Sequence, residues 1–196
     1  MILPRLTFDD GPSESTGTIL DLLAEHDVRA HFFVIGMRAQ EHPDLIERAA
    51  AEGHVIGNHT WDHAGLAAIP DNADVIEKLA RTNDVITKTL GAPPTLFRAP
   101  YGSVDARVER LAATLGLTHM GWDVVTQDFS APDVETIRKA ILDAKQGEIV
   151  LMHDGNGDIP NGPNGRPKTV QALADALTAL REPQPRRPGS RGRQAQ

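Results

Sequence analysis

The chain has 196 residues, 40% of them hydrophobic, which fits one globular domain able to bury a full core. Its net charge is −7, and because residues 181–196 hold five Arg and one Glu, the rest of the chain carries −11. This acidic body excludes nucleic acid as the main partner, since phosphate binding requires a positive face. The lack of cysteine excludes disulfides and thiolate metal sites, which leaves histidine and carboxylates as the strong metal ligands.

The two ends of the chain give separate expectations. The N-terminal "MILPRLTFDD" holds no apolar export segment with a cleavage site, and no apolar run elsewhere is long enough to cross a membrane. We therefore expect no membrane partner and a cytoplasmic location for the chain as given, or a secreted one if an export signal has been removed. Residues 182–196 are rich in Arg, Pro and Gln, which predicts a disordered basic tail.

Short apolar segments alternate along the chain with longer amphipathic ones. In chain order, strands are predicted at 5–9, 31–36, 54–59, 96–100, 119–125 and 148–153, and helices at 15–26, 43–52, 72–90, 105–115, 133–145 and 168–181. This alternation is typical of a parallel sheet, and "HFFVIG" and "IVLM" are apolar on both faces, as a sheet covered on both sides requires. Because "DDGPSEST" is not the glycine-rich turn of a nucleotide-binding open sheet, the predicted fold class is α/β, a single barrel with six counted strands.

Polar side chains with catalytic chemistry follow these strands. In an α/β barrel the C-terminal ends of the strands meet at one rim, where the active site forms. At or just past these ends lie Asp9, Asp10, His59, His63, Arg98, Asp123 and His153. The sequence therefore predicts a site at that rim, while the histidines at 26, 31, 42, 54 and 119 are assigned to structure.

Two of these motifs are consistent with a metal site. In "NHTWDH", His59 and His63 stand four residues apart, close enough to hold one ion, although a surface helix would show the same spacing. In "TFDDGP", the adjacent Asp9 and Asp10 repel each other, and a bound cation would supply the charge that lets both ionise. A solvated turn that caps the next helix explains the turn but not the second acid.

Two further motifs carry candidates for acid–base chemistry. In "FRAPYG", Arg98 can hold a carboxylate in a bidentate pair, and the turn that follows exposes backbone N–H groups that can face an oxyanion. In "LMHD", His153 ends an apolar run. The structural alternatives are a surface arginine before a loop and a core histidine.

Taken together, "TFDDGP", "HTWDH", "RAPYG", "WDVVTQDF" and "LMHD" resemble, in order and spacing, the five motifs of the polysaccharide deacetylases, carbohydrate esterase family four. The resemblance runs from about residue 4 to residue 181, so residues 1–181 are expected to form the catalytic domain. It implies a distorted (β/α) barrel with about seven strands, one more than the pattern shows. It also implies metal-dependent removal of acetyl groups from N-acetylated amino sugars, chitooligosaccharides or acetylated xylan.

The resemblance also implies a role for each motif residue. Asp10, His59 and His63 resemble the metal ligands, Asp9 resembles the general base, and Arg98 resembles the residue that holds this base. Tyr101 resembles the residue whose backbone N–H donates to the oxyanion, and His153 resembles the general acid. Asp128 resembles the acid that orients His153, and Leu151 resembles a wall of the acetyl pocket. The fourth motif departs from the family at Phe129, where Trp is common, and at Val125, where Asp is frequent. Phe129 keeps an apolar wall without an indole N–H, and Trp61, Tyr101 and Trp122 can stack on sugar rings.

The expected cofactor is one divalent metal ion. Zn²⁺ is favoured, and Co²⁺, Ni²⁺ or Fe²⁺ also suit two imidazoles and one carboxylate. Two other functions fit these residues: a non-haem Fe(II) oxygenase, which uses the same ligand set, and a catalytically silent carbohydrate-binding barrel. The expected partner is an acetylated carbohydrate or a small amino-sugar substrate bound by a monomer, with the polar loop 155–167 beside the site.

Overall fold

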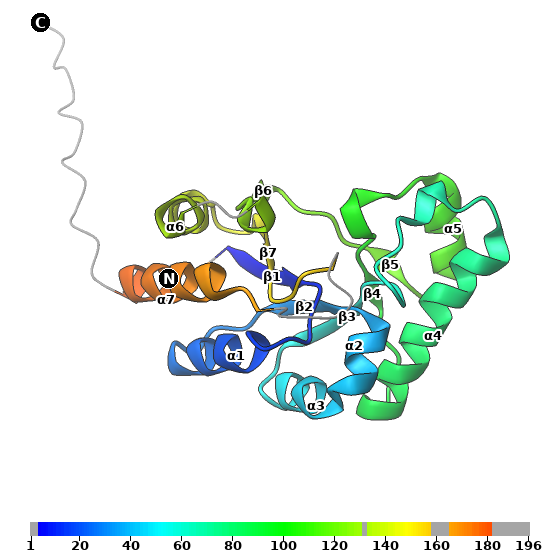
Figure 1. Ribbon diagram of the computed structural model, residues 1–196, viewed down its shortest axis with the longest axis horizontal. Helices are drawn as coiled ribbons and strands as arrows, with labels where there is room; N and C mark the ends of the chain where they lie inside the picture. Colours follow the sequence, from blue (N-terminus) through cyan, green and yellow to red (C-terminus); the bar gives the residue numbers. More distant parts are fainter. Residues whose placement is uncertain (1–3, 131–132, 158–164, 182–196) are drawn as a thin grey trace, which may run out of the picture.

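A seven-stranded parallel sheet forms the centre of the fold (Figure 1), in the order β5-β4-β3-β2-β1-β7-β6. The computed structural model describes residues 4–130, 133–157 and 165–181, so the predicted basic tail at 182–196 lies outside the described residues. The strands are β1 (Arg5–Asp9), β2 (His31–Val34), β3 (Val55–Asn58), β4 (Leu96–Phe97), β5 (Thr118–His119), β6 (Val124–Val125) and β7 (Ile149–His153). The sheet curls into a half-barrel, which confirms the predicted α/β barrel class.

Helices surround the curled sheet and cover its outer face (Figure 1). They are α1 (Thr16–Glu25), α2 (Gly36–Glu41), α3 (Pro43–Ala51), α4 (Asn72–Leu90), α5 (Ala106–Thr114), α6 (Val134–Asp143) and α7 (Pro167–Arg181), with short 3-10 turns η1 (Leu66–Ala68), η2 (Pro100–Gly102) and η3 (Asp128–Ser130). No described helix is both long and apolar enough to span a membrane.

The core divides along the sheet into two hydrophobic clusters. The larger one packs β1, β2 and β7 against α1, α3, α6 and α7, and it includes the fully buried Phe8 and Phe32, whose rings stack 5.1 Å apart. The smaller one packs Phe97 of β4 against α4 and α5. Burial of these apolar faces fixes the strands, and thereby fixes the rim on which the site lies.

The predicted single strand at 119–125 is wrong, because this segment forms two strands at opposite edges of the sheet. β5 pairs with β4, whereas β6 pairs with β7. The Met120 N–H donates to the Phe97 carbonyl at 2.9 Å, and the Asp123 N–H donates to the Ile149 carbonyl at 2.9 Å. The chain therefore crosses the open side of the half-barrel between residues 120 and 123. This crossing supplies the seventh strand, so the family-based expectation of about seven is confirmed and the count of six is corrected.

Candidate active site

The central strand pair places two predicted catalytic residues next to each other. β1 and β7 are parallel neighbours, and their register sets Asp9 opposite His153. Each is the last residue of its strand, so both side chains lie at the C-terminal edge of the sheet. The rim predicted from the sequence is therefore the place where these groups meet.

Asp9 forms a buried ion pair with Arg98. Arg98 Nη1 donates to Asp9 Oδ1 at 2.8 Å and to Thr7 Oγ1 at 2.7 Å, and the arginine side chain is fully buried. The other guanidinium nitrogens donate to the carbonyls of Met120 and Gly121 at 3.0 and 2.8 Å. Arg98 thus fixes one oxygen of Asp9 and leaves Oδ2 facing His59, 3.9 Å from its Nε2.

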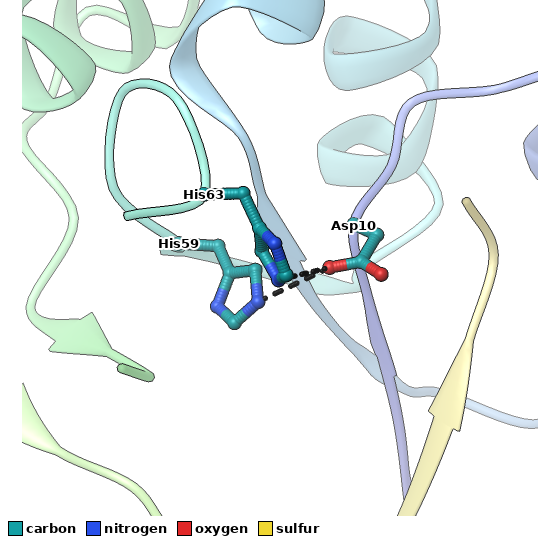
Figure 2. Close-up of side chains that lie close together, drawn as sticks. All are labelled: Asp10, His59 and His63. Carbon is teal, nitrogen blue, oxygen red and sulfur yellow. Dashed lines mark ion pairs between the residues drawn. The ribbon is translucent and has the colours of Figure 1, made fainter. Parts of the chain in front are cut away.

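Asp10, His59 and His63 converge on one point, as Figure 2 shows. Asp10 Oδ1 lies 3.2 Å from His59 Nε2 and 3.1 Å from His63 Nε2. Burial acts to raise the pKa of Asp10, but the two adjacent imidazoles outweigh it and hold that pKa well below its usual value. Asp10 is therefore an anion within reach of two imidazole nitrogens.

The donor set fits a divalent cation. Asp10 Oδ1 is buried and accepts no hydrogen bond from the described residues in suitable geometry, and one ligand atom from each of the three residues lies within 4.8 Å of the others. His59 Nδ1 lies 2.7 Å from the Arg98 carbonyl, which can only accept, so Nδ1 carries a proton and Nε2 is the ring nitrogen available to an ion beside Asp10. Two imidazoles and one carboxylate are the ligands expected for zinc and related ions.

The backbone around this cluster is held in an uncommon conformation. Asp10, Thr60, His63 and Tyr101 have φ angles of 77°, 67°, 61° and 58°, in the left-handed region that non-glycine residues rarely adopt. Such strain concentrates at functional sites, where the surrounding contacts hold it in place. One such contact comes from Gly157, whose N–H donates to Asp10 Oδ2 at 2.8 Å.

His153 is positioned by Asp128. Its Nδ1 lies 2.7 Å from Asp128 Oδ1, its backbone N–H donates to Asp128 Oδ2 at 2.8 Å, and Thr169 Oγ1 donates to the same oxygen at 2.9 Å. Burial favours the neutral imidazole, but the hydrogen bond and charge of Asp128, with smaller contributions from Asp10 and Asp9, raise the pKa of His153 to about 9. Burial also acts to raise the pKa of Asp128, which His153 nevertheless holds below its usual value.

A cavity of about 370 Å³ joins these groups. Its walls come from several strand ends and the loops that follow them. The lining residues are Asp9, Asp10, His59, His63, Ala99, Tyr101, Trp122, Val125, Phe129, Leu151, His153, Asn156 and Arg166. Leu151 is nearly buried, whereas Tyr101 and Phe129 are 68% and 53% exposed, so aromatic side chains stand at the mouth above an acid- and histidine-lined floor.

Most predicted site residues line this cavity, and four lie outside its lining. Arg98 and Asp128 are outside the lining but contact two residues within it, Asp9 and His153 respectively. Asp123, expected at a strand end on the rim, instead accepts from the Ile149 N–H at 2.8 Å, at the beginning of β7. Trp61 also lies outside the cavity lining and packs under the Arg81 guanidinium, 3.9 Å from its ring centroid.

Sequence reasoning missed several contributors. Thr169, Gly157, Asn156 and Arg166 were not singled out, although the last three belong to the polar loop expected beside the site. The available signal for Gly157 was a glycine close behind "LMHD": a Cβ at this position would lie 2.3 Å from His63 Cε1. Only glycine lets the backbone approach the imidazole so closely.

Comparison with known proteins agrees with this geometry. The polysaccharide deacetylase family model matches residues 5–120. The chain is 42% identical to a chitooligosaccharide deacetylase of Rhizobium leguminosarum bv. trifolii over 152 residues, which are 76% of this chain and 70% of that protein. It is 40% identical to the peptidoglycan-N-acetylglucosamine deacetylase PgdA of Listeria monocytogenes over 151 residues, which are 76% of this chain but only 32% of that protein.

A solved structure shows the same fold. The family 4 carbohydrate esterase from Streptomyces lividans, determined in complex with acetate, superposes with a TM-score of 0.82 at 31% identity, over 91% of this chain and 88% of that chain. Fold and comparisons together define a carbohydrate-active hydrolase built on a (β/α) half-barrel. The chain belongs to the polysaccharide deacetylase family, carbohydrate esterase family 4, and is a carbohydrate deacetylase.

Proposed function

We propose that the chain hydrolyses the acetamide of N-acetylglucosamine units in an oligosaccharide or glycan, with a divalent cation held by Asp10, His59 and His63. The observation that carries this proposal is the β1–β7 register, which sets Asp9 beside His153 in one cavity with the Asp10–histidine cluster. The relatives named above act on chitooligosaccharide and on peptidoglycan N-acetylglucosamine, which supports an N-acetyl substrate. Zn²⁺ is the proposed ion.

The bound cation would polarise the acetyl carbonyl and make a water molecule more acidic. Asp9 is the proposed general base, because Arg98 holds its Oδ1 while Oδ2 faces the cavity. Asp9 takes a proton from the water that adds to the acetyl carbon. The backbone N–H of Tyr101, in its left-handed turn, is the proposed donor to the oxyanion that forms.

His153 is the proposed general acid for the second half of the reaction. Its Nδ1 is held by Asp128, so Nε2–H is the proton that faces the substrate. An amide nitrogen leaves poorly until it is protonated, so transfer of this proton accompanies cleavage of the carbon–nitrogen bond. The products are acetate and the free amino sugar.

The apolar side chains define where the substrate lies. Leu151, 5% exposed, is the proposed wall against the acetyl methyl group. Phe129 packs edge-on against His153 with ring centroids 5.7 Å apart, so it borders the leaving group. Tyr101 and Trp122 line the same cavity and present aromatic surface to the sugar ring.

Acetate release from N,N′,N″,N‴-tetraacetylchitotetraose tests the proposal, measured after chelation and again after Zn²⁺ or Co²⁺ is returned. We expect activity to disappear on chelation and to recover with metal. His63→Ala should lose both bound metal, by elemental analysis, and activity, whereas His42→Ala, an exposed histidine outside the cavity, should keep both. Oxygen consumption with Fe(II) in place of acetate release would indicate the oxygenase, and sugar binding without hydrolysis would indicate the silent barrel.

A further inference from the structure

The wall of the cavity carries a guanidinium that the proposed chemistry does not use. Arg166 lies directly before α7 and lines the cavity. Its backbone N–H donates to Ser15 Oγ at 2.6 Å, and its Nε donates to the Gly155 carbonyl at 2.5 Å. Both ends of the residue are therefore tied to the scaffold, which limits the positions that the guanidinium can take.

The terminal nitrogens of Arg166 differ from those of the other arginines near the site. Arg98 is paired with Asp9, and Arg38 donates to the backbone carbonyls of Asp10 and Asn156. Among the described residues, Arg166 Nη1 and Nη2 have neither a hydrogen-bond acceptor nor a carboxylate within 4 Å. The two terminal nitrogens of Arg166 thus border the substrate cavity without an acceptor among the described residues.

The chemistry of the Arg166 guanidinium indicates which ligand it would bind. A guanidinium presents parallel N–H donors that match the two oxygens of a carboxylate, and this bidentate pair is stronger than a bond to a neutral hydroxyl. The negative charges already in the cavity have their own partners, since Asp9 pairs with Arg98 and Asp10 faces two imidazoles. A positive group is therefore left for the substrate.

We propose that Arg166 binds a carboxylate carried by the substrate, so that the preferred substrate is an N-acetylglucosamine unit linked to an acidic sugar. This inference rests on the proposed function and narrows its substrate class. It distinguishes an acidic glycan from neutral chitooligosaccharide, a choice that the cation site and the acid–base pair leave open.

The test compares three tetrasaccharides with alternating units. One joins N-acetylglucosamine to N-acetylmuramic acid, one has the same sugars with the lactyl carboxylate converted to a neutral amide, and one joins N-acetylglucosamine to glucuronic acid. We expect kcat/KM for the lactyl acid to exceed that for its amide by about tenfold or more, the usual size of a charge-assisted pair. The glucuronic acid arm identifies which position of the carboxylate Arg166 reaches.

Variants assign the preference to the residue. Arg166→Gln should bring the acid-to-amide ratio of kcat/KM close to one, and Arg166→Lys should keep part of it because the charge remains. Arg110→Gln, the same change at an exposed position on α5 outside the cavity, should leave the ratio as in the wild type. KM for the acid should rise with ionic strength in the wild type and in Arg110→Gln but not in Arg166→Gln.

Two results would overturn the inference: a wild-type ratio near one, or an equal loss on acid and amide in Arg166→Gln. Calorimetric binding of the same tetrasaccharides is measured alongside turnover. Preferential binding of the acid that depends on Arg166, without acetate release from any arm, would refute the proposed function and uphold the inference. Acetate release without discrimination would do the reverse.

Discussion

Asp9 and Asp10 are adjacent in sequence, yet their carboxylates have different neighbours. Asp9 faces a fully buried guanidinium, whereas Asp10 faces two imidazoles. The left-handed backbone of Asp10, with φ of 77°, directs the chain away from the strand direction immediately after β1. The proposed base and the proposed metal ligand can therefore stand side by side with different roles.

This separation predicts that two isosteric substitutions affect different properties, metal binding in one case and turnover in the other. Asp10→Asn should weaken metal binding, because a neutral amide replaces an anionic ligand. Asp9→Asn should keep the metal and lower kcat by about 10²-fold or more, the usual contribution of a positioned general base. Elemental analysis and acetate release decide between them. Loss of metal in Asp9→Asn with retention in Asp10→Asn would exchange the two assignments.

The pH dependence should follow His153. Burial lowers its pKa, but Asp128 outweighs this and raises it to about 9, so kcat/KM should fall as the pH rises through about 9. A bound cation repels the imidazolium and would move this fall to lower pH. Asp128→Asn removes the neighbouring anion and should shift the fall in kcat/KM to still lower pH. The measurement is the pH profile of kcat/KM at saturating metal. Glu135→Gln, an exposed acid on α6, should leave the profile in place.

The same group links stability to pH. Because the pKa of His153 is raised from 6.5 to about 9 on folding, its contribution to the free energy of unfolding is fully present below 6.5 and is lost as the pH rises through about 9. In metal-free protein, urea denaturation should show this loss between these values. The loss should shrink in Asp128→Asn, and an unchanged pH dependence there would contradict the Asp128–His153 pair.

At the scale of elements, the beginning of helix α2 is a boundary that the local sequence pattern does not predict. The apolar run "HFFVIG" predicts a strand to residue 36, but β2 ends at Val34 and α2 begins at Gly36. A Cβ on Gly36 would lie 2.4 Å from Thr82 Oγ1 and 2.6 Å from Trp61 Cε3. The turn into α2 is therefore fixed by close packing against α4 rather than by the sequence of α2 itself.

Gly36→Ala should consequently destabilise the fold, by about 1–3 kcal/mol as for other overpacked sites. Gly17→Ala is the matched control, because Gly17 lies in α1 and its added Cβ would meet only Leu45 Cδ2, at 3.9 Å. That change should be neutral or stabilising, since alanine favours a helix. Equal midpoints of urea denaturation for both variants would show that the α2–α4 contact can adjust.

The difference between what the sequence predicted and what required the structure has a physical basis. Residues whose chemistry is local to a strand end, such as Asp10 and His59, were found from residue type and spacing. Residues that contact the site from distant parts of the sequence were harder to predict. For example, Thr169 donates to Asp128, which lies 41 positions earlier in the chain. The split of 119–125 was hidden because β5 and β6 are only two residues each and owe their existence to partners at opposite edges.

At the scale of the whole molecule, Arg98 joins parts of the half-barrel that share no strand pairing. It stands after β4, pairs with Asp9 at the end of β1, and donates to the segment that crosses the open side through Met120 and Gly121. A single buried side chain therefore holds Asp9, the proposed base, and also holds the crossing segment against the sheet.

Removal of this side chain should affect both stability and activity. Arg98→Met should cost about 3–5 kcal/mol of unfolding free energy, because Asp9 is left buried and unpaired. Combining it with Asp9→Asn should cost less than the sum of the two single changes, a coupling that a double-mutant cycle in urea measures. Strict additivity would show that Arg98 and Asp9 contribute no interaction energy to stability. All three variants should lose most of their acetate release.

The order of strands in the sheet has a consequence for biosynthesis. β1 is made first but lies between β2 and β7, and its pairing with β7 joins residues more than 140 positions apart. Such distant contacts form slowly, so until β7 emerges from the ribosome β1 has one unpaired edge, and an unpaired apolar strand readily pairs with other chains. Nascent chains that stall before residue 148 should thus be aggregation-prone as well as inactive, because His153, the proposed general acid, is carried by the strand that protects this edge.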